Sequence, residues 1–173
     1  MKKFRLAAGV VSALFFAANS AFAYDVLLTF EGKVVPTTCK VDGLSEIKLN
    51  PVSTSALKSS GDFAGASPFT IHVSGCDATK LKGKFSFEFP KVDAKTGALI
   101  NSAPGGSTAQ VQLLDHGSNP IHLLASFAQE PFAPVVANGS EARFAFAARY
   151  LAGEDPVTAG DVKAELTFDL VYE

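Results

Sequence analysis

Two short motifs in this chain of 173 residues contain residue types that could act in nucleophilic catalysis. Residues 55–58 are Ser-Ala-Leu-Lys, an S-x-x-K pattern, and residues 95–97 are Lys-Thr-Gly. Serine β-lactamases and penicillin-binding proteins combine these two motifs with a third, S-D-N. No S-D-N lies between them here, and the chain is too short for the large α/β domain that presents the serine on a helix. We therefore interpret both motifs as chance matches, with residues 95–97 in a turn.

The other residues with catalytic or ligand-binding potential do not form a recognisable set. His72 falls on the polar face of a predicted strand, and His116 lies in a predicted turn, apart from His122. The sequence has no G-x-S-x-G motif and no D-x-D-x-D-G calcium loop. The pair Gly105-Gly106 does not precede a predicted helix, so it does not predict a phosphate site. We expect no enzyme activity, no cofactor and no metal ion.

The first 23 residues have the three parts of a secretory signal peptide. Lys2, Lys3 and Arg5 precede an apolar run over residues 6–18, and an A-x-A cleavage site follows at residues 21–23. The run is shorter than the roughly 20 residues needed to cross a bilayer. We expect cleavage after Ala23, which leaves the 150 residues 24–173 as the exported chain. No second apolar run follows, so no membrane span is predicted in the mature chain.

Cleavage also changes the charge. The whole chain has 15 basic and 17 acidic residues, for a net charge of -2. Three basic residues belong to the signal peptide, so the exported chain has 12 against 17 and a net charge of -5. Such a chain has no basic field for nucleic acid.

Cys39 and Cys76 are the two cysteines of the sequence. Because an exported chain reaches an oxidising compartment, the favoured interpretation is a disulfide between them. A metal pair is the weaker alternative, since no histidine lies at ligand spacing from either cysteine.

The elements that must position these residues are predicted to be strands. Apolar and polar residues alternate with a period of two in five segments, and clusters of Gly, Pro, Asn and Asp lie between them. The segments are residues 69–74, 85–89, 110–113, 143–150 and 162–172. The mature chain has no long segment of helical period, and only residues 53–58 predict a short helical turn. We expect an all-β sandwich in one domain.

Taken together, these features resemble the pilins of the chaperone–usher (type 1-like) fimbriae over nearly all of the mature chain. No single stretch is specific, but their order, their spacing and the signal peptide carry the resemblance. The stretches are FEGKVV at 30–35, TCKV at 38–41, the residues at 51–57, PFTIHVSGC at 68–76, VQLLD at 111–115, and F-x-L-x-YE at 168–173.

The resemblance implies an incomplete immunoglobulin-like sandwich that lacks its final strand. The missing strand leaves an apolar groove beside the C-terminal strand. A periplasmic chaperone fills the groove by lending a strand, and at the outer-membrane usher the N-terminal extension of the next subunit replaces it. This is β-strand addition, in which main-chain hydrogen bonds give affinity and alternate side chains fill pockets.

The resemblance also assigns roles to residues at the end of the chain. It implies that Phe168, Leu170 and Tyr172 line the groove and are recognised by the chaperone, whose basic residues anchor the carboxylate of Glu173. An ordinary core strand would show the same alternation.

The predicted donor strand lies in residues 24–32. Its side chains Tyr24, Val26, Leu28 and Phe30 share one face of an extended strand. Donor arms in the family are often longer and contain a glycine among these positions, which this segment lacks. The alternative is that residues 26–35 form the first strand of the domain itself.

We therefore expect a signal peptide at 1–23, a donor extension at 24–32 and a pilin domain at 33–173. The expected function is that of a structural subunit of an adhesive fimbrium on the cell surface, with neighbouring subunits, a chaperone and an usher as partners. A shaft subunit is favoured, because 150 residues leave no room for a second, receptor-binding domain. The alternatives are a minor or adaptor pilin, a single-domain adhesin, or a self-contained periplasmic sandwich that binds a ligand.

Overall fold

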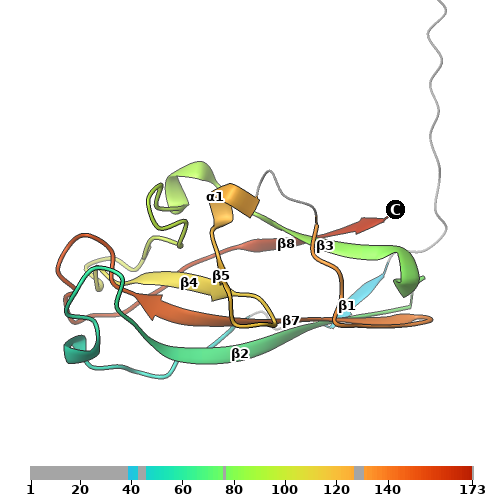
Figure 1. Cartoon of the computed structure of the whole chain (residues 1–173), viewed down its shortest axis with the longest axis horizontal. Helices are drawn as coiled ribbons and strands as arrows, with labels where there is room; N and C mark the ends of the chain where they lie inside the picture. Colours follow the sequence, from blue (N-terminus) through green and yellow to red (C-terminus); the bar gives the residue numbers. More distant parts are fainter. Residues whose placement is uncertain (1–38, 43–45, 76, 127–130, 173) are drawn as a thin grey trace, which may run out of the picture. The chain divides into compact units, whose positions relative to one another are not determined.

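The computed structural model describes residues 39–42, 46–75, 77–126 and 131–172 (Figure 1). All of them belong to one compact unit, Pro36–Glu173. The predicted signal peptide, the predicted donor segment, Cys76 and Glu173 lie outside the described residues.

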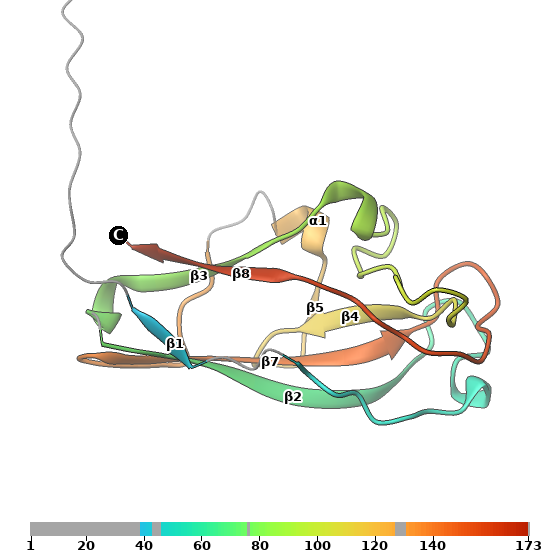
Figure 2. The same cartoon turned by 180° about the vertical axis from the view of Figure 1, so that it is seen from behind.

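The described strands form two antiparallel sheets that pack as layers (Figures 1 and 2). In the large sheet the strands follow the order β1-β2-β7-β4-β5, and β6 also pairs with β7; the small sheet contains β3 and β8. The bounds in the large sheet are β1 Lys40–Asp42, β2 Phe63–Ser74, β4 Gln110–Leu114, β5 Pro120–Ile121, β6 Val136–Asn138 and β7 Glu141–Leu151. Those in the small sheet are β3 Leu81–Ser86 and β8 Thr167–Tyr172. The predicted all-β sandwich is confirmed.

Short helical turns connect the strands. The predicted turn near residues 53–58 is the 3-10 helix η1, Thr54–Ala56, whose backbone is capped by the Ser53 hydroxyl accepting from the Ser55 amide at 3.2 Å. The others are η2 Ala78–Lys80, η3 Phe89–Lys91 and the single-turn helix α1 Leu123–Ser126. No helix in the described part of the chain is long and apolar enough to span a membrane.

The core between the sheets is rich in phenylalanine. Phe144 and Phe146 of β7 alternate with outward residues, as the sequence pattern predicts, and are 1% and 5% exposed. Phe146 packs against Phe69 of β2 and Phe85 of β3, with ring centroids 5.7 and 4.9 Å apart. Because the rings interdigitate across both layers, they fix the two sheets against one another.

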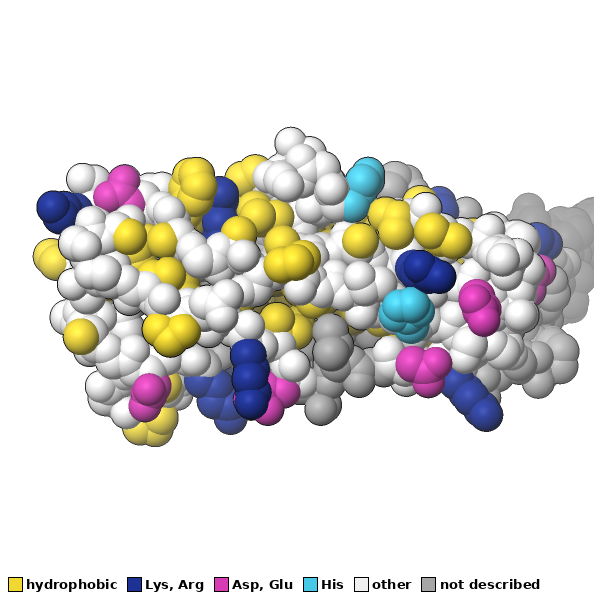
Figure 3. Space-filling view, turned by 90° about the horizontal axis from the view of Figure 1, so that it is seen from below, with side chains coloured by type: hydrophobic (Ala, Val, Ile, Leu, Met, Phe, Trp, Pro, Cys, Tyr) yellow, Lys and Arg dark blue, Asp and Glu magenta, His cyan; other side chains and the backbone are white. Residues whose placement is uncertain are grey.

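The outer face of the large sheet, unlike its inner face, does not take part in the phenylalanine-rich core. Ala145 and Ala147 of β7 point away from the core, since they alternate with buried residues. Figure 3 shows this side of the molecule, with hydrophobic side chains across its middle and charged ones mostly toward its edges.

Two predicted strands are only partly correct. The segment 162–172 forms a strand only over β8, Thr167–Tyr172. The alternation of residues 85–89 predicts a strand, but β3 ends at Ser86 and Phe89 begins the helix η3 with 74% of its surface exposed. Pro90 explains the difference, because proline has no amide hydrogen for a sheet ladder and fits the first turn of a helix.

Candidate functional site

Within the described part of the chain, the strand β8 is paired along one edge only. It pairs with β3 from Leu81↔Tyr172 to Ser86↔Thr167, and among the described residues no other strand pairs with it. Figure 2 shows β8 along the upper layer of the sandwich. An edge whose backbone groups have no ladder partner is a template for another strand.

The inward side chains of β8 are only partly covered. Phe168 and Leu170 lie opposite Phe85 and Gly83 of β3 and therefore face the core with them. Phe85 is 5% exposed, whereas Phe168 and Leu170 are only half-buried, and Tyr172 is 40% exposed. The apolar face of β8 therefore lacks the cover that a further strand would supply.

The strand β1 shows the same half-covered state. Val41 lies opposite Val73 of β2, so both side chains point to the core face of the large sheet. Val73 is 1% exposed and Val41 is 51% exposed. We call the inward, half-covered side chains of these segments the open strip. Its members are Val41, Phe168, Leu170 and Tyr172.

Cys39, next to the start of β1, contacts the end of β8. Its Sγ atom lies 2.6 Å from the Tyr172 hydroxyl oxygen, so the start of β1 and the end of β8 are in contact. Cys39 is disulfide-bonded. The other cysteine of the sequence, Cys76, lies outside the described residues, and the pairing between them stays a prediction.

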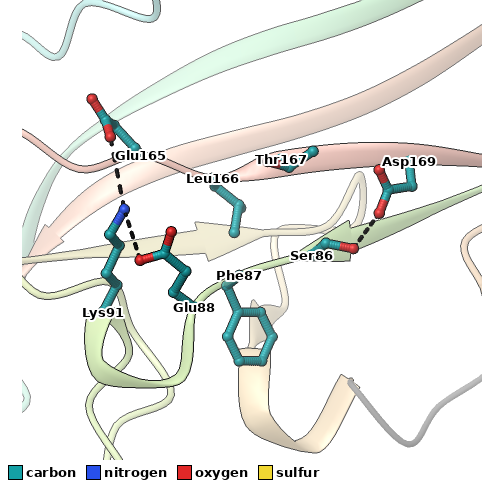
Figure 4. Close-up of a pocket in the computed structure, with 8 residues that line it drawn as sticks. All are labelled: Ser86, Phe87, Glu88, Lys91, Glu165, Leu166, Thr167 and Asp169. Carbon is teal, nitrogen blue, oxygen red and sulfur yellow. Dashed lines mark hydrogen bonds and ion pairs between the residues drawn. The ribbon is translucent and has the colours of Figure 1, made fainter.

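A pocket of about 410 Å³ lies on the outward side of the small sheet (Figure 4). Lys91 pairs there with Glu88 at 3.2 Å and with Glu165 at 3.9 Å, and the Ser86 hydroxyl donates to Asp169. A hydrogen bond from Lys163, then the charges of Lys163 and Lys91, lower the pKa of Glu165. Exposed ion pairs of this kind contribute little to stability. The polar side chains of this pocket therefore pair with one another.

The two catalytic-looking motifs are structural. Ser55 lies in the exposed helix η1, with its hydroxyl 2.8 Å from that of Ser53. Residues 95–97 form a turn, as predicted, in which the Asp93 carboxylate accepts from the amides of Lys95 and Thr96, both at 2.9 Å. Gly97 closes the turn with φ 64°, a left-handed conformation that favours glycine.

The histidines also do not converge. His72 is exposed opposite Arg143, His116 is exposed after β4, and the His122 Nδ1 accepts from the Ala125 amide at 3.3 Å in α1. In the described part of the chain, no group of three or more His, Cys, Asp or Glu residues could hold a metal ion.

Asp93 gives the first testable prediction. The backbone hydrogen bond from Thr96 is the largest influence on this carboxyl, and despite opposing burial its pKa is lowered. A lowered folded-state pKa adds stability above the ordinary pKa of aspartate, and that stability is lost as the pH falls through the folded-state pKa. We expect Asp93→Asn to cost about 1–2 kcal/mol at pH 7, the usual value of such hydrogen bonds.

Urea unfolding at pH 7 and at about pH 3 measures this effect. The difference between the wild type and Asp93→Asn should shrink at the lower pH, because Asp93 begins to be protonated as the pH falls below the ordinary pKa of aspartate toward its lowered folded-state pKa. Asp155→Asn, at an exposed loop position, is the matched control. An equal difference at both pH values would show that the Asp93 charge does not stabilise the turn.

Sequence reasoning missed two residues in and next to β3, the partner strand of β8. Gly83 lies in the middle of β3, and Phe132 pairs with it from the connection between α1 and β6. An isolated glycine inside a strand signals a close approach of other atoms, so the sequence Lys82-Gly83-Lys84 carried a usable sign. Phe132 carried none, because its partner is 49 residues away in the sequence.

Comparison with known proteins agrees with this architecture. The family model described as fimbrial protein matches residues 28–173. The F17 fimbrial protein of Escherichia coli is 33% identical over 183 aligned positions, covering 100% of both chains. The major fimbrial subunit SMF-1 of Stenotrophomonas maltophilia (strain K279a) is 31% identical, covering 90% of this chain and 95% of that protein.

A solved structure shares the fold. A chain from a chaperone–usher pilus superposes with a TM-score of 0.59 at 19% identity, covering 86% of this chain and 96% of that one. The likeness confirms the predicted pilin-type sandwich. The family is one of structural proteins rather than enzymes, which agrees with the absence of catalytic motifs. This chain therefore belongs to the fimbrial protein family and is a structural pilin of a fimbrium, exported to the cell surface.

Proposed function

We propose that this chain is a shaft subunit of an adhesive fimbrium and that it polymerises by accepting a strand beside β8. In this proposal a periplasmic chaperone lends the strand first, and at the outer-membrane usher residues 24–32 of the next subunit replace it. The observation that carries the proposal is the half-covered apolar face of β8 beside an edge with no described partner.

The predicted donor segment suits this edge in pattern and length. Tyr24, Val26, Leu28 and Phe30 alternate with other residues and so present one apolar face. At about 3.3 Å per residue, residues 24–30 extend roughly 20 Å, and the six residues of β8 extend roughly 17 Å. Strand addition uses this combination of backbone pairing and alternate apolar side chains.

The remaining parts of the proposal concern maturation. Signal cleavage after Ala23 makes Tyr24 the first residue of the donor segment. A Cys39–Cys76 disulfide closes a loop with 36 residues between the cysteines, for which the chain-entropy model gives roughly 3–4 kcal/mol. Basic residues of the chaperone bind the carboxylate of Glu173. The similarity to the major fimbrial subunit SMF-1 supports the proposal that this chain is a subunit of the fimbrial shaft.

A peptide of residues 24–33 should raise the unfolding temperature of the exported chain. A ligand at 100 times its Kd adds about 2.7 kcal/mol. For a domain of this size that corresponds to a rise of roughly 5–11 °C. Differential scanning calorimetry with and without the peptide measures the rise. The control is the same peptide with Val26 and Leu28 replaced by aspartate, which should leave the unfolding temperature unchanged.

A monomer that is stable alone and indifferent to both peptides would contradict the proposal. That behaviour belongs to a self-contained β-sandwich, the alternative class of function.

A further inference from the structure

Gly83 occupies the centre of the small sheet. It lies opposite Leu170 of β8 on one side. On the other side it forms a bridge with Phe132, in which the Gly83 amide donates to the Phe132 carbonyl at 2.9 Å and the Phe132 amide donates back at 2.7 Å. Gly83 therefore has a backbone neighbour on each edge of β3. A side chain at this position would have to lie above or below the sheet.

The ring of Phe168 fills the space where any other residue at position 83 would place its side chain. A Cβ atom built on Gly83 would meet the Phe168 Cζ at 2.0 Å and the two Cε atoms at 2.7 and 2.8 Å. These distances are far below van der Waals contact. Glycine weakens a strand, and a glycine in mid-strand indicates that other atoms approach its backbone closely. Here those atoms are the tip of the Phe168 ring.

The core side of Phe168 has no room for the ring to move. Its centroid lies 5.1 Å from that of Phe85, 5.1 Å from Phe144 and 5.7 Å from Phe146. Phe85, Phe144 and Phe146 are each at most 5% exposed. Because protein interiors are close-packed, a displaced ring cannot enter this cluster. The half-exposed side of β8, along the open strip, is the direction that remains.

We propose that Gly83 determines the size of the donor side chain that the open strip accepts. By receiving the Phe168 ring, Gly83 keeps clear the space beside β8 into which a large apolar donor side chain fits. A larger residue at position 83 turns the ring toward the open strip and fills that space. This inference rests on the proposed strand addition, and it names Gly83 as a specificity-determining residue that acts through Phe168.

The test compares Gly83→Ala, Phe168→Leu and the double variant with the wild type, all as the exported chain. The probe is the peptide of residues 24–33, and calorimetry measures its affinity. We expect Gly83→Ala to bind the peptide at least about tenfold more weakly, because one buried apolar side chain is worth that factor. The double variant should bind within about threefold of Phe168→Leu, since leucine lacks the Cζ and Cε atoms that an alanine Cβ would meet.

Each other outcome overturns the inference. Equal affinity of wild type and Gly83→Ala would show that Phe168 does not control the space. A persistent loss in the double variant would show that alanine acts by another route. Failure of Gly83→Ala to fold would show that the ring has no second position beside β8. If the wild type itself does not bind the peptide, the proposed strand addition fails first, which is a distinguishable result.

Discussion

Replacement of Leu170 by glutamate is expected to abolish fibre assembly and to weaken binding of the residue 24–33 peptide at least about 100-fold. Leu170 lies inward on β8, half-buried against the core and opposite Gly83. A donor strand would cover it completely, and a carboxylate covered by apolar side chains without a partner costs several kcal/mol. Electron microscopy of surface fibres and calorimetry with the peptide measure the two effects.

Val171→Glu is the matched control, one residue along the same strand. Val171 pairs with Lys82 on the outward face of the small sheet, so a carboxylate there lies beside a lysine and points away from the core. We expect this variant to assemble fibres in normal amount. Equal loss of fibres in both variants would mean that β8 tolerates no charge on either face. Normal fibres from Leu170→Glu would show that the inward face of β8 does not receive a strand.

Phe144→Ala is expected to lower the free energy of unfolding by about 3–5 kcal/mol. Phe144 is 1% exposed, and its ring packs against Phe168 with centroids 5.1 Å apart. Removal of the ring leaves a cavity at the junction of the two sheets, which the surrounding rings fill only in part. Denaturant unfolding of the exported chain measures the loss.

Phe89→Ala makes the same change at a surface position. Phe89 is 74% exposed at the start of η3, so its truncation should change stability by no more than about 0.5 kcal/mol. A loss below about 1 kcal/mol for Phe144→Ala, or similar losses for both variants, would contradict the assignment of the aromatic cluster as the core.

The sandwich could be predicted from the sequence because most strands have one solvent-facing side and one buried side. In β7 the inward Phe144 and Phe146 alternate with Ala145 and Ala147, and this pattern is visible without any tertiary information. The prediction was wrong where a local rule prevailed over alternation. Phe89 continues the period of Phe85 and Phe87, but Pro90 cannot donate to a ladder, so the strand ends.

The open strip could be predicted only in part. The inward positions Phe168, Leu170 and Tyr172 follow from alternation, but the sequence does not reveal that their cover is incomplete. That property depends on which strands lie beside β8, and Val41 joins the strip only through its pairing with Val73. The fit of the Phe168 ring over Gly83 likewise depends on the register between β3 and β8.

The central claim is that β8 of one subunit pairs with an N-terminal segment of another. The most direct measurement is the structure of the assembled fibre by cryo-electron microscopy, at a resolution that traces individual strands. We expect residues 24–32 of a neighbouring subunit to lie alongside Thr167–Tyr172, with their apolar side chains against Phe168 and Leu170. A fibre in which this edge of β8 faces solvent, or in which residues 26–35 of the same chain occupy it, would contradict the claim.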